Sequence, residues 1–452
     1  MKKYDVVVIG LGPAGMAVTN MASEMGLKVL AVESRNIGGE CSNTGCIPSK
    51  ALLAISEKNP MLAEPFARIN ADIDHIRENR ISSLSGKADI LLGQGPASFV
   101  NGEVIRVGEE EYTGKHIFIA TGTRPFIPPI EGLDKVEYLT NENLFQLEAI
   151  PESLTFIGGG AIACEMSQAF ARMGCKCTIV HDRPYLLPNG EKEAGEFLQR
   201  GCEKLGITVY NSRVIARVSK RDNGRIVVRT RDGEEIESEK LVVAAGRSYD
   251  FSSLHLENAG VEYGRKGIVV DDYLRTTNKH IHAIGDCNGS YLLSHAAMHQ
   301  GMLALMNTMM MPPLKKKYLK YPVPWTVFTE PQVSHVGRTS AELDAEHIDY
   351  EMVETKYSDY ENAVAGDKGE GYVRVYASSA GRIYGVSIVG ANSGEMINEW
   401  ALAIQHNIGL YDLMMTMHSF PTMGFLSKRI GENWMMKKMQ PGFVKKLLKL
   451  FF

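Results

Sequence analysis

The stretch VVVIGLGPAG, residues 6–15, places an apolar run directly before three glycines. Gly10, Gly12 and Gly15 have the G-x-G-x-x-G spacing that is typical of a strand, a tight turn and a helix that bind a dinucleotide. Glycines in such a turn let backbone N–H groups and the helix N-terminus approach a pyrophosphate. The next apolar run, KVLAVE, ends at Glu33, whose carboxylate suits the hydroxyls of a ribose. The sequence therefore predicts a dinucleotide-binding fold at the start of the chain.

A second stretch, LTFIGGGAIA at 154–163, repeats this pattern with Gly158, Gly160 and Ala163. Its next strand, CTIV, runs into His181, which follows Gly158 at the spacing that separates Glu33 from Gly10. One such motif is weak evidence, but two in the same strand–turn–helix context indicate two bound dinucleotides. The alternative interpretation is a pair of tight turns that bind nothing.

The second motif has no carboxylate at the position that corresponds to Glu33. His181 stands there, followed by Asp182 and Arg183. The loss of the carboxylate removes repulsion toward a 2′-phosphate, and Arg183 could pair with one. These residues favour NADPH over NADH; the alternative is an exposed His-Asp-Arg turn that plays no part in selectivity.

Composition limits the function classes. The 452 residues suffice for two or three domains, and a net charge of −4 leaves no basic excess for nucleic acid. No apolar stretch reaches the length of a membrane span, and residues 4–9 resemble a buried strand rather than a signal peptide. We expect a cytoplasmic protein without a nucleic-acid partner.

Seven cysteines are present, of which we expect five to be small buried thiols: Cys164, Cys175, Cys177, Cys202 and Cys287. Cys41 and Cys46, in GGECSNTGCIPSK at 38–50, differ from these. Their spacing does not fit a zinc site, so we predict no metal. A redox pair is favoured over two inert thiols. Because IPSKALLAI predicts a helix with Pro48 in its first turn, Cys46 would lie at a helix N-terminus, which lowers a thiol pKa.

The rest of the chain suggests a further domain. Apolar strands that end in polar turns recur at IFIATGTRP, LVVAAGR and IHAIGDC. After the linker MPPLKKKYLKYP, residues 319–440 alternate in β fashion and then turn helical, which indicates an α+β domain.

The chain resembles the class I pyridine nucleotide–disulfide oxidoreductases, such as dihydrolipoamide dehydrogenase, glutathione reductase and mercuric reductase. The resemblance rests on GGECSNTGCIPSKALL, ATGTRP, IGGGAIACEMS, AAGR, AIGDC and FTEPQVSHVG, in this order. It implies an α/β fold with two Rossmann-like domains, for FAD and NAD(P), and an α+β homodimerisation domain. The implied boundaries are 1–147 with 248–318 for FAD, 148–247 for NAD(P) and 319–440 for the dimer.

The same resemblance implies roles for single residues. Cys46 would be the flavin-side thiol and Cys41 the exposed interchange thiol that meets the substrate. Lys50 would lie near the flavin N5 with Glu165 as its countercharge, and Asp286 would hold the ribityl chain. The remaining cofactor-binding positions that it implies are Thr121, Gly122, Gly246, Arg247 and Gly285.

The chain departs from the family pattern near its C-terminus. In MHSFPTMGFLSK, residues 417–428, Phe420 stands where the family has an acid histidine, and Phe425 stands at the position of its glutamate partner. General acid–base catalysis contributes typically about 10²–10⁴-fold, so the reduction of small aliphatic disulfides becomes doubtful. His418, two positions earlier, is a candidate replacement acid.

Three functions remain open. The first is an NAD(P)H-dependent flavoprotein reductase with an unusual small-molecule or protein thiol, disulfide or sulfur-type acceptor. The second is a carbon–sulfur cleaving or carboxylating enzyme that resembles 2-ketopropyl-coenzyme M oxidoreductase/carboxylase, which also has a phenylalanine in this place. The third is a non-enzymatic redox sensor. We favour the first function.

The tail 441–452 has the sequence PGFVKKLLKLFF, which is basic and amphipathic. Contact of this tail with a membrane surface is therefore an alternative to docking on the protein.

Overall fold

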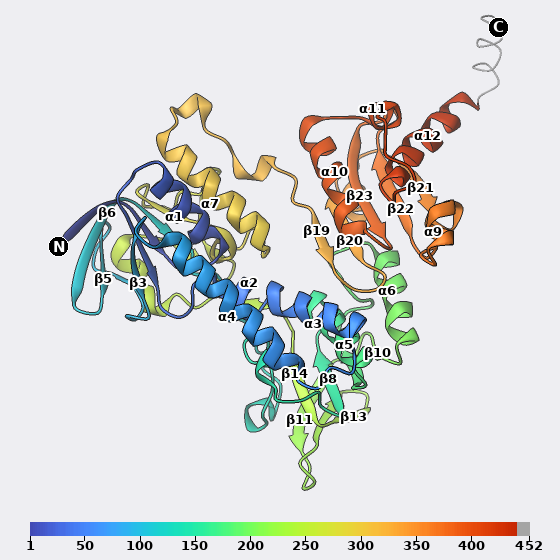
Figure 1. The fold of residues 1–452 in the computed structure, drawn as a ribbon, viewed down its shortest axis with the longest axis horizontal. Coiled ribbons are helices and arrows are strands. Elements are labelled where there is room, and N and C mark those ends of the chain that lie inside the picture. The colour runs from blue at the N-terminus through green and yellow to red at the C-terminus, as the bar shows by residue number, and fades with distance from the viewer. Residues whose placement is uncertain (441–452) are drawn as a thin grey trace, which may run out of the picture. The chain divides into compact units, whose positions relative to one another are not determined.

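The structure is a computed structural model, and it describes residues 1–440 (Figure 1). The predicted amphipathic tail, 441–452, lies outside the described residues. The chain divides into two compact units. The first unit comprises Met1–Glu152, Ser219–Ile226 and Glu239–Lys320. The second comprises Ser153–Val218, Val227–Ser238 and the chain from Tyr321.

A seven-stranded sheet forms the first unit, in the order β3-β2-β1-β6-β5-β4 with β18 beside β6. Its strands are β1 (Lys2–Ile9), β2 (Val29–Glu33), β3 (Asp89–Leu92), β4 (Ser98–Phe99), β5 (Val104–Val107), β6 (Glu110–Ile119) and β18 (Ile281–Ala283). The register pairs Ile9 with Val32 and Ile119, and Ile119 with Ala283, all in parallel. The carboxyl ends of β1, β2, β6 and β18 therefore meet at one edge, where open α/β sheets bind their ligands.

Helices flank this sheet and carry the two predicted thiols. They are α1 (Pro13–Glu24), α2 (Gly39–Asn43), α3 (Cys46–Lys58), α4 (Pro65–Leu84) and α7 (Ser294–Met309). α1 packs against α7, and α4 packs against both α2 and α3. The short helix α2 is thus held between two longer helices.

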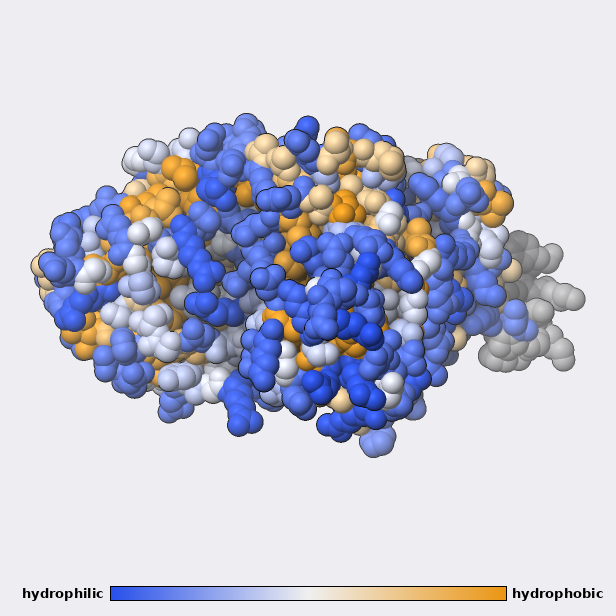
Figure 2. Space-filling model, turned by 90° about the horizontal axis from the view of Figure 1, so that it is seen from below, coloured by the Kyte–Doolittle hydropathy of each residue, from blue (hydrophilic) through white to orange (hydrophobic). Residues whose placement is uncertain are grey.

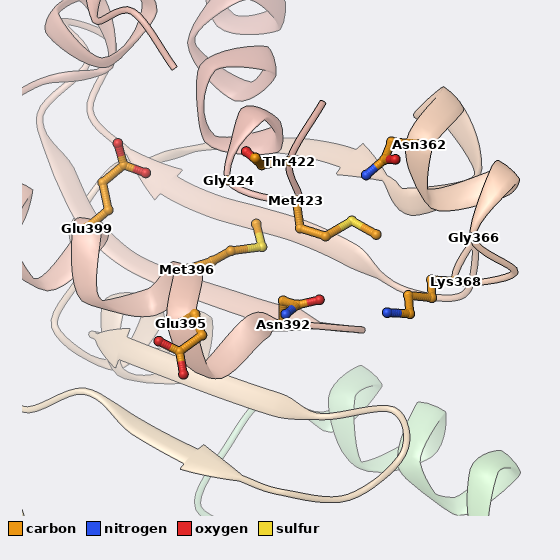
Figure 3. Close-up of a pocket in the computed structure, with 10 residues that line it drawn as sticks. All are labelled: Asn362, Gly366, Lys368, Asn392, Glu395, Met396, Glu399, Thr422, Met423 and Gly424. Atoms are coloured by element: carbon orange, nitrogen blue, oxygen red, sulfur yellow. The ribbon is translucent and has the colours of Figure 1, made fainter. Parts of the chain in front are cut away.

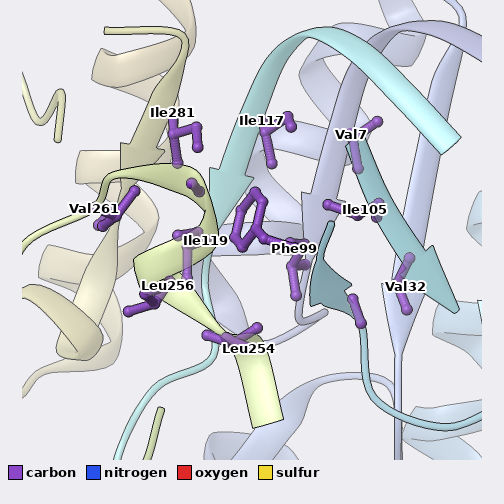
Figure 4. Close-up of a cluster of buried hydrophobic side chains, with 14 of the residues drawn as sticks. Val7, Val32, Phe99, Ile105, Ile117, Ile119, Leu254, Leu256, Val261 and Ile281 are labelled. Carbon is purple, nitrogen blue, oxygen red and sulfur yellow. The ribbon is translucent and has the colours of Figure 1, made fainter. Parts of the chain in front are cut away.

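The core of the first unit gathers apolar side chains from its strands and from the segment around Leu254–Val261 (Figure 4). Phe99, Ile105, Ile117 and Ile119 are almost completely buried in it. Burial of a side chain of this size contributes about 1.5–3 kcal/mol each. Along β5, the buried Ile105 and Val107 alternate with the exposed Arg106, as expected for a sheet with one face against a core.

Short elements complete the first unit. They are β7 (Arg124–Pro125), β14 (Lys240–Val243), β15 (Arg247–Ser248), β16 (Tyr263–Gly264), β17 (Gly267–Ile268) and the 3-10 turns Leu133–Lys135, Leu144–Gln146, Ser252–Leu254, Leu256–Ala259, Gly285–Asn288, Pro312–Leu314 and Tyr318–Lys320. β7 pairs with β15 in antiparallel fashion, with Arg247 opposite Pro125. This pairing brings Arg247 beside the turn that contains Thr123.

The second unit begins with another parallel strand–helix fold. Its elements are β8 (Ser153–Ile157), α5 (Ala161–Arg172), β9 (Lys176–Val180), α6 (Lys192–Lys204) and β10 (Thr208–Tyr210), followed by β11 (Ile215–Lys220), β12 (Ile226–Thr230) and β13 (Glu235–Ser238). β9 lies between β8 and β10, and Val180 pairs with both Ile157 and Tyr210. The glycine turn after β8 has the same context as the turn after β1.

The C-terminal part of the second unit contains a five-stranded antiparallel sheet, in the order β19-β20-β23-β22-β21. Its elements are β19 (Trp325–Val327), β20 (Val333–Gly337), α8 (Ser340–Ala345), β21 (Glu351–Lys356), the turn Tyr357–Asp359, α9 (Glu361–Ala365), β22 (Tyr372–Ala377), β23 (Ile383–Val389), α10 (Ser393–His406), α11 (Leu410–Met415) and α12 (Phe425–Met439). α10 packs on β20 and β23, and Trp400 is completely buried between them. The predicted fold class, two Rossmann-like folds and an α+β C-terminal part, is confirmed.

The face of the molecule in Figure 2 is covered mainly by hydrophilic residues, with hydrophobic residues scattered among them. Among residues 1–440, no helix has the length and the apolar character that a bilayer crossing requires.

Candidate active site

The first glycine turn requires glycine at two positions. Gly10 has a φ of +98°, and a Cβ there would lie 2.5 Å from Ala120 O. A Cβ on Gly15 would overlap the carbonyl oxygen of Gly10. Side chains would therefore push β1, α1 and the strand β6 apart. The local pattern predicted from the sequence is present.

The N-terminus of α1 fits an anionic ligand. Gly12 caps the helix without a side-chain hydrogen bond, and no acidic residue stands in the first turn. Its free N–H groups can bind a pyrophosphate. Glu33 is buried beside it, and its two carboxylate oxygens accept hydrogen bonds from Leu11 N (2.8 Å) and Arg35 N (2.8 Å). This carboxylate is fixed by the backbone, with acceptor capacity left for ribose hydroxyls, so these residues fit a dinucleotide such as FAD.

The second glycine turn is similar in form. Gly158 has a φ of +122°, and Gly160 caps α5 without a side-chain hydrogen bond. A Cβ on Gly160 would meet no atom within 4 Å, which leaves room for a phosphate. This helix N-terminus also lacks an acidic residue in its first turn. The turn thus fits a second dinucleotide.

His181 is buried, which differs from the alternative prediction that it lies in an exposed turn. Its imidazole is buried against Gly159, and Nε2 lies 2.7 Å from Asn211 Oδ1. Burial lowers the pKa of His181, although the hydrogen bond with Asn211 opposes this shift. Asp182 and Arg183 are exposed, and their charged groups lie 3.6 Å apart. Arg183 therefore presents an exposed guanidinium beside this turn.

The carboxyl edge of the first sheet carries Asp286. Burial raises the pKa of Asp286 to about 6, while the charge of Arg247 lowers it. Gly285 precedes it with a φ of +74°, and its N–H donates to Gln300 Oε1 at 2.8 Å. Thr121 and Gly122 follow β6 at the same edge. The sequence-predicted residues at 121–122 and 285–286 are thus close to the first glycine turn.

Cys41 and Cys46 lie in the dithiol loop, residues 38–46. Cys46 is the first residue of α3, as predicted, and Cys41 lies in α2. Both are free thiols, and Cys46 Sγ lies 3.4 Å from Ser294 Oγ. A hydrogen bond with Cys46 and burial raise the pKa of Cys41. These effects favour the protonated form of the Cys41 thiol, and Cys46 stands at the N-terminus of α3, where a negative charge is favourable.

The other five cysteines are buried, as predicted. Burial raises the pKa of Cys202 to about 11 and that of Cys287 to about 12, so neither is a thiolate at neutral pH. Among residues 1–440, no three His, Cys, Asp or Glu side chains cluster as metal ligands do.

Two polar anchors of the dithiol loop were missed by the sequence analysis. Glu40 forms an ion pair with Arg247 and accepts from Asn141 Nδ2 at 2.6 Å. Arg247, predicted to bind a cofactor, uses its guanidinium on Glu40, Asn141 and Thr123. On the other side, Arg80 of α4 donates to Ser42 Oγ. No sequence spacing links these residues, because tertiary packing alone brings them together.

Lys50 and Glu165 lie in different units, and their predicted ion pair stays a prediction. Glu165 is buried in α5, and its Oε1 accepts from Phe328 N at 2.9 Å. Lys50 lies one turn after Cys46 on α3 and is partly buried.

The C-terminal loop, residues 416–424, presents Phe420 before α12. The rings of Phe420 and Phe425 meet edge-to-face with centroids 5.3 Å apart, and both pack on Tyr360. Phe420 is 65% exposed in the single chain. The position that carries an acid in the family pattern is therefore apolar here.

His418 has partners at both ring nitrogens. Nδ1 lies 3.1 Å from Thr416 O and Nε2 lies 2.7 Å from Glu399 Oε1, so each nitrogen faces an acceptor. The imidazole is only 9% exposed. His418 links the C-terminal loop to α10 through Glu399, a residue that sequence analysis missed, and its role as a replacement acid stays a prediction.

A pocket of about 510 Å³ lies next to this loop (Figure 3). Glu395 and Glu399 stand at one end, Lys368 and Asn362 at the other, and Met396 and Met423 between them. The pocket combines opposite charges with apolar walls, and Glu399 connects it to His418.

Comparisons with known proteins agree with this arrangement. Residues 4–301 match the model of the pyridine nucleotide-disulphide oxidoreductase family, and residues 323–428 match that of its dimerisation domain. A dihydrolipoyl dehydrogenase of Thermus scotoductus is 33% identical over 94% of this chain and 95% of its own length. A mercuric reductase of Lysinibacillus sphaericus is 30% identical over 93% of this chain and 80% of its own.

Among solved structures, the Cu(II) complex of the HOCl-induced flavoprotein disulfide reductase RclA from Escherichia coli superimposes with a TM-score of 0.89. It is 26% identical and covers 96% of this chain and 99% of its own. The dimerisation domain implies a homodimer, and FAD and a pyridine nucleotide are typical of the family. These matches favour an enzyme over a non-enzymatic sensor. The chain belongs to the pyridine nucleotide-disulphide oxidoreductase family, as an NAD(P)H-dependent flavoprotein disulfide oxidoreductase.

Proposed function

We propose that this enzyme passes electrons through the Cys41–Cys46 pair to a sulfur-type acceptor whose leaving group departs as an anion. The observation that carries the proposal is the contrast between an intact dithiol loop and a phenylalanine pair where the family pattern has its acid. The acceptor is a small-molecule or protein disulfide, persulfide or oxidised sulfur species.

The proposed organisation assigns each cofactor to one glycine turn. FAD would lie on Gly10, Gly12, Gly15 and Glu33, in a domain of residues 1–147 and 248–318, with Asp286 near its ribityl chain. The nicotinamide dinucleotide would lie on Gly158 and Gly160, in residues 148–247, and residues 319–440 would form the dimer. FAD, when bound, relays two electrons from the nicotinamide to the disulfide. Lys50 and Glu165 would form a charge pair beside it.

The two thiols have different roles in the proposed mechanism. Cys41 holds the proton of the reduced pair through its hydrogen bond with Cys46. Cys46, at the N-terminus of α3, is the thiolate that faces the flavin side. Cys41, once ionised, attacks the acceptor disulfide, forms a mixed disulfide and expels one thiolate. The Cys46 thiolate then attacks the Cys41 sulfur, which expels the second thiolate and restores the disulfide.

One turnover consumes one hydride from NAD(P)H and one proton from solvent, and it converts one acceptor disulfide into two thiols. The proton can reach the expelled thiolates after they leave the site. A leaving group that is stable as an anion needs no proton during its departure. Phe420 and Phe425 supply no proton, and the two ring nitrogens of His418 already contact Thr416 O and Glu399 Oε1.

We infer that NADPH is the preferred nucleotide. Arg183 is exposed beside the second turn, and no carboxylate occupies the position of His181. A guanidinium–phosphate hydrogen bond contributes roughly 1.5–3 kcal/mol, so Arg183→Ala should lower the specificity for NADPH about tenfold and leave NADH unchanged. The measurement is the rate of flavin reduction by each nucleotide. A wild-type preference for NADH would overturn the inference.

A comparison of acceptors tests the proposed function. Turnover of the FAD-loaded enzyme should be about 10²-fold or more higher with an aromatic disulfide of acidic leaving thiol than with lipoamide or oxidised glutathione. The rate should rise with pH as Cys41 ionises, with no decline at alkaline pH, because no acid has to stay protonated. Cys41→Ser is the control and should lose turnover with every acceptor.

Equal turnover with lipoamide would contradict the proposal. So would a bell-shaped pH profile that His418→Ala abolishes, since it would identify His418 as the acid. The carbon–sulfur alternative would give a product that is not a thiol, which product analysis of the same assays detects.

A further inference from the structure

Arg80 is a cation that contacts the dithiol loop and that the proposed mechanism has not used. It lies on α4, and its Nη1 donates to Ser42 Oγ, next to Cys41 in the chain. The same atom would lie 2.5 Å from a Cβ on Gly38, so the guanidinium packs directly on the loop backbone. Met16 Sδ, 3.7 Å from Nη1, confines it on another side.

No carboxylate lies within ion-pair distance of Arg80 anywhere in residues 1–440, whereas the neighbouring arginines have one. Arg77, one turn earlier on α4, pairs with Asp74 at 2.8 Å while it donates to Asn43 of the loop. Arg247 pairs with Glu40. Of the three guanidinium groups that hold the dithiol loop, Arg80 alone keeps an uncompensated positive charge.

We propose that Arg80 is the fixed cation that stabilises the Cys41 thiolate during disulfide exchange. A guanidinium keeps its charge at every working pH and gives up no proton, so it favours the thiolate without acting as an acid. This role needs no imidazolium, and the C-terminal loop carries Phe420 at the position where the resemblance implies a histidine. The inference rests on the proposed exchange role of Cys41.

Other charged side chains stand on α2 and on the two helices packed against it: Glu40 on α2, Lys50, Glu57 and Lys58 on α3, and Arg68, Asp72, Asp74, His75, Arg77 and Glu78 on α4. Cys46 and burial raise the pKa of Cys41, and the Ser294 hydroxyl and the charge of Arg80 lower it. Arg80 is therefore the charged side chain that opposes the effect of Cys46.

The test measures alkylation of Cys41 by iodoacetamide against pH, in FAD-loaded enzyme with a Cys46→Ser background. Peptide mass spectrometry follows Cys41 by itself. Arg80→Gln should raise the midpoint of alkylation by about one pH unit, a shift typical of the loss of a nearby opposite charge. Arg80→Lys keeps the positive charge, so its midpoint of alkylation should lie close to that of the enzyme with Arg80. In the enzyme with both cysteines, Arg80→Gln should lower kcat/KM for the aromatic disulfide about tenfold near neutral pH.

Arg77→Gln is the matched control, because it breaks a contact with the same loop without removing an uncompensated charge. An unchanged midpoint in Arg80→Gln, or an equal shift in Arg77→Gln, overturns the inference. If Arg80→Gln fails to fold, Ser42→Ala must raise the midpoint by a smaller amount, and no rise there also overturns it. Retained turnover in Cys41→Ser would instead overturn the proposed function.

Discussion

The dithiol loop and the C-terminal loop have the same kind of anchor but keep different parts of the family pattern. Each loop is anchored in part by one glutamate: Glu40 binds Arg247 in the first, and Glu399 binds His418 in the second. The dithiol loop keeps both of its reactive groups. The C-terminal loop keeps its place before α12 but presents Phe420 and Phe425 instead of an acid and its partner.

This difference separates the two halves of the reaction. In the proposed mechanism, electron delivery depends on the dithiol loop and on the two glycine turns, and Cys41, Cys46, Gly10 and Gly158 stand at the positions that the motifs predict. Acceptor chemistry depends on the group that supplies or withholds a proton. A change confined to that group alters which disulfides are reduced without altering how electrons arrive.

The largest effect is expected from restoring the acid. Phe420→His with Phe425→Glu should raise kcat/KM for lipoamide about 10²-fold, at the low end of what general acid catalysis contributes. The two rings already touch, at 5.3 Å between centroids, so an imidazole and a carboxylate at these positions are within reach of each other. The introduced carboxylate would also stand at the N-terminus of α12, where a negative charge is favourable.

The single variant Phe425→Glu is the control and should give no gain, because it adds a carboxylate without an acid. The double variant should also show a decline in rate at alkaline pH that the wild type lacks. No gain in the double variant, with flavin content unchanged, would show that the loss of the acid is not what limits aliphatic disulfides.

The sequence predicted the features that local backbone geometry decides. Gly10 and Gly158 have positive φ values because each turn reverses between a strand and a helix, and the spacing alone indicates this. Cys46 at the start of α3 follows from Pro48, which fits the first turn of a helix. Such features need only a few consecutive residues, so a motif contains all the information.

The partners of the charged side chains could not be predicted in this way. Glu40 and Arg247 are far apart in the sequence and meet because β15 pairs with β7. Arg80 reaches Ser42 because α4 packs on α2. His418 was identified as a candidate acid, but its role as an anchor depends on α10 placing Glu399 beside it. These contacts are set by tertiary packing, which no spacing in the chain records.

Substitution of the two glutamate anchors is expected to have a smaller effect. Glu40→Gln should weaken the dithiol loop, because Arg247 is 14% exposed and would lose the only carboxylate within ion-pair distance of it in the described chain. The expected local cost is about 1.5 kcal/mol, the low end for hydrogen bonds to charged groups. Amide hydrogen exchange of residues 39–46 should then accelerate about tenfold.

Glu399→Gln should cost less, because a neutral His418 can still satisfy both neighbours. Its Nδ1–H would donate to Thr416 O, now 3.1 Å away, while Nε2 would accept from the new amide. Exchange of residues 416–422 should therefore accelerate less than about threefold, which corresponds to roughly 0.6 kcal/mol. Each variant serves as the control for the other loop. Equal acceleration in both loops would mean that the anchors are equivalent, and a larger effect at Glu399 would identify the C-terminal loop as the one that depends on its charge.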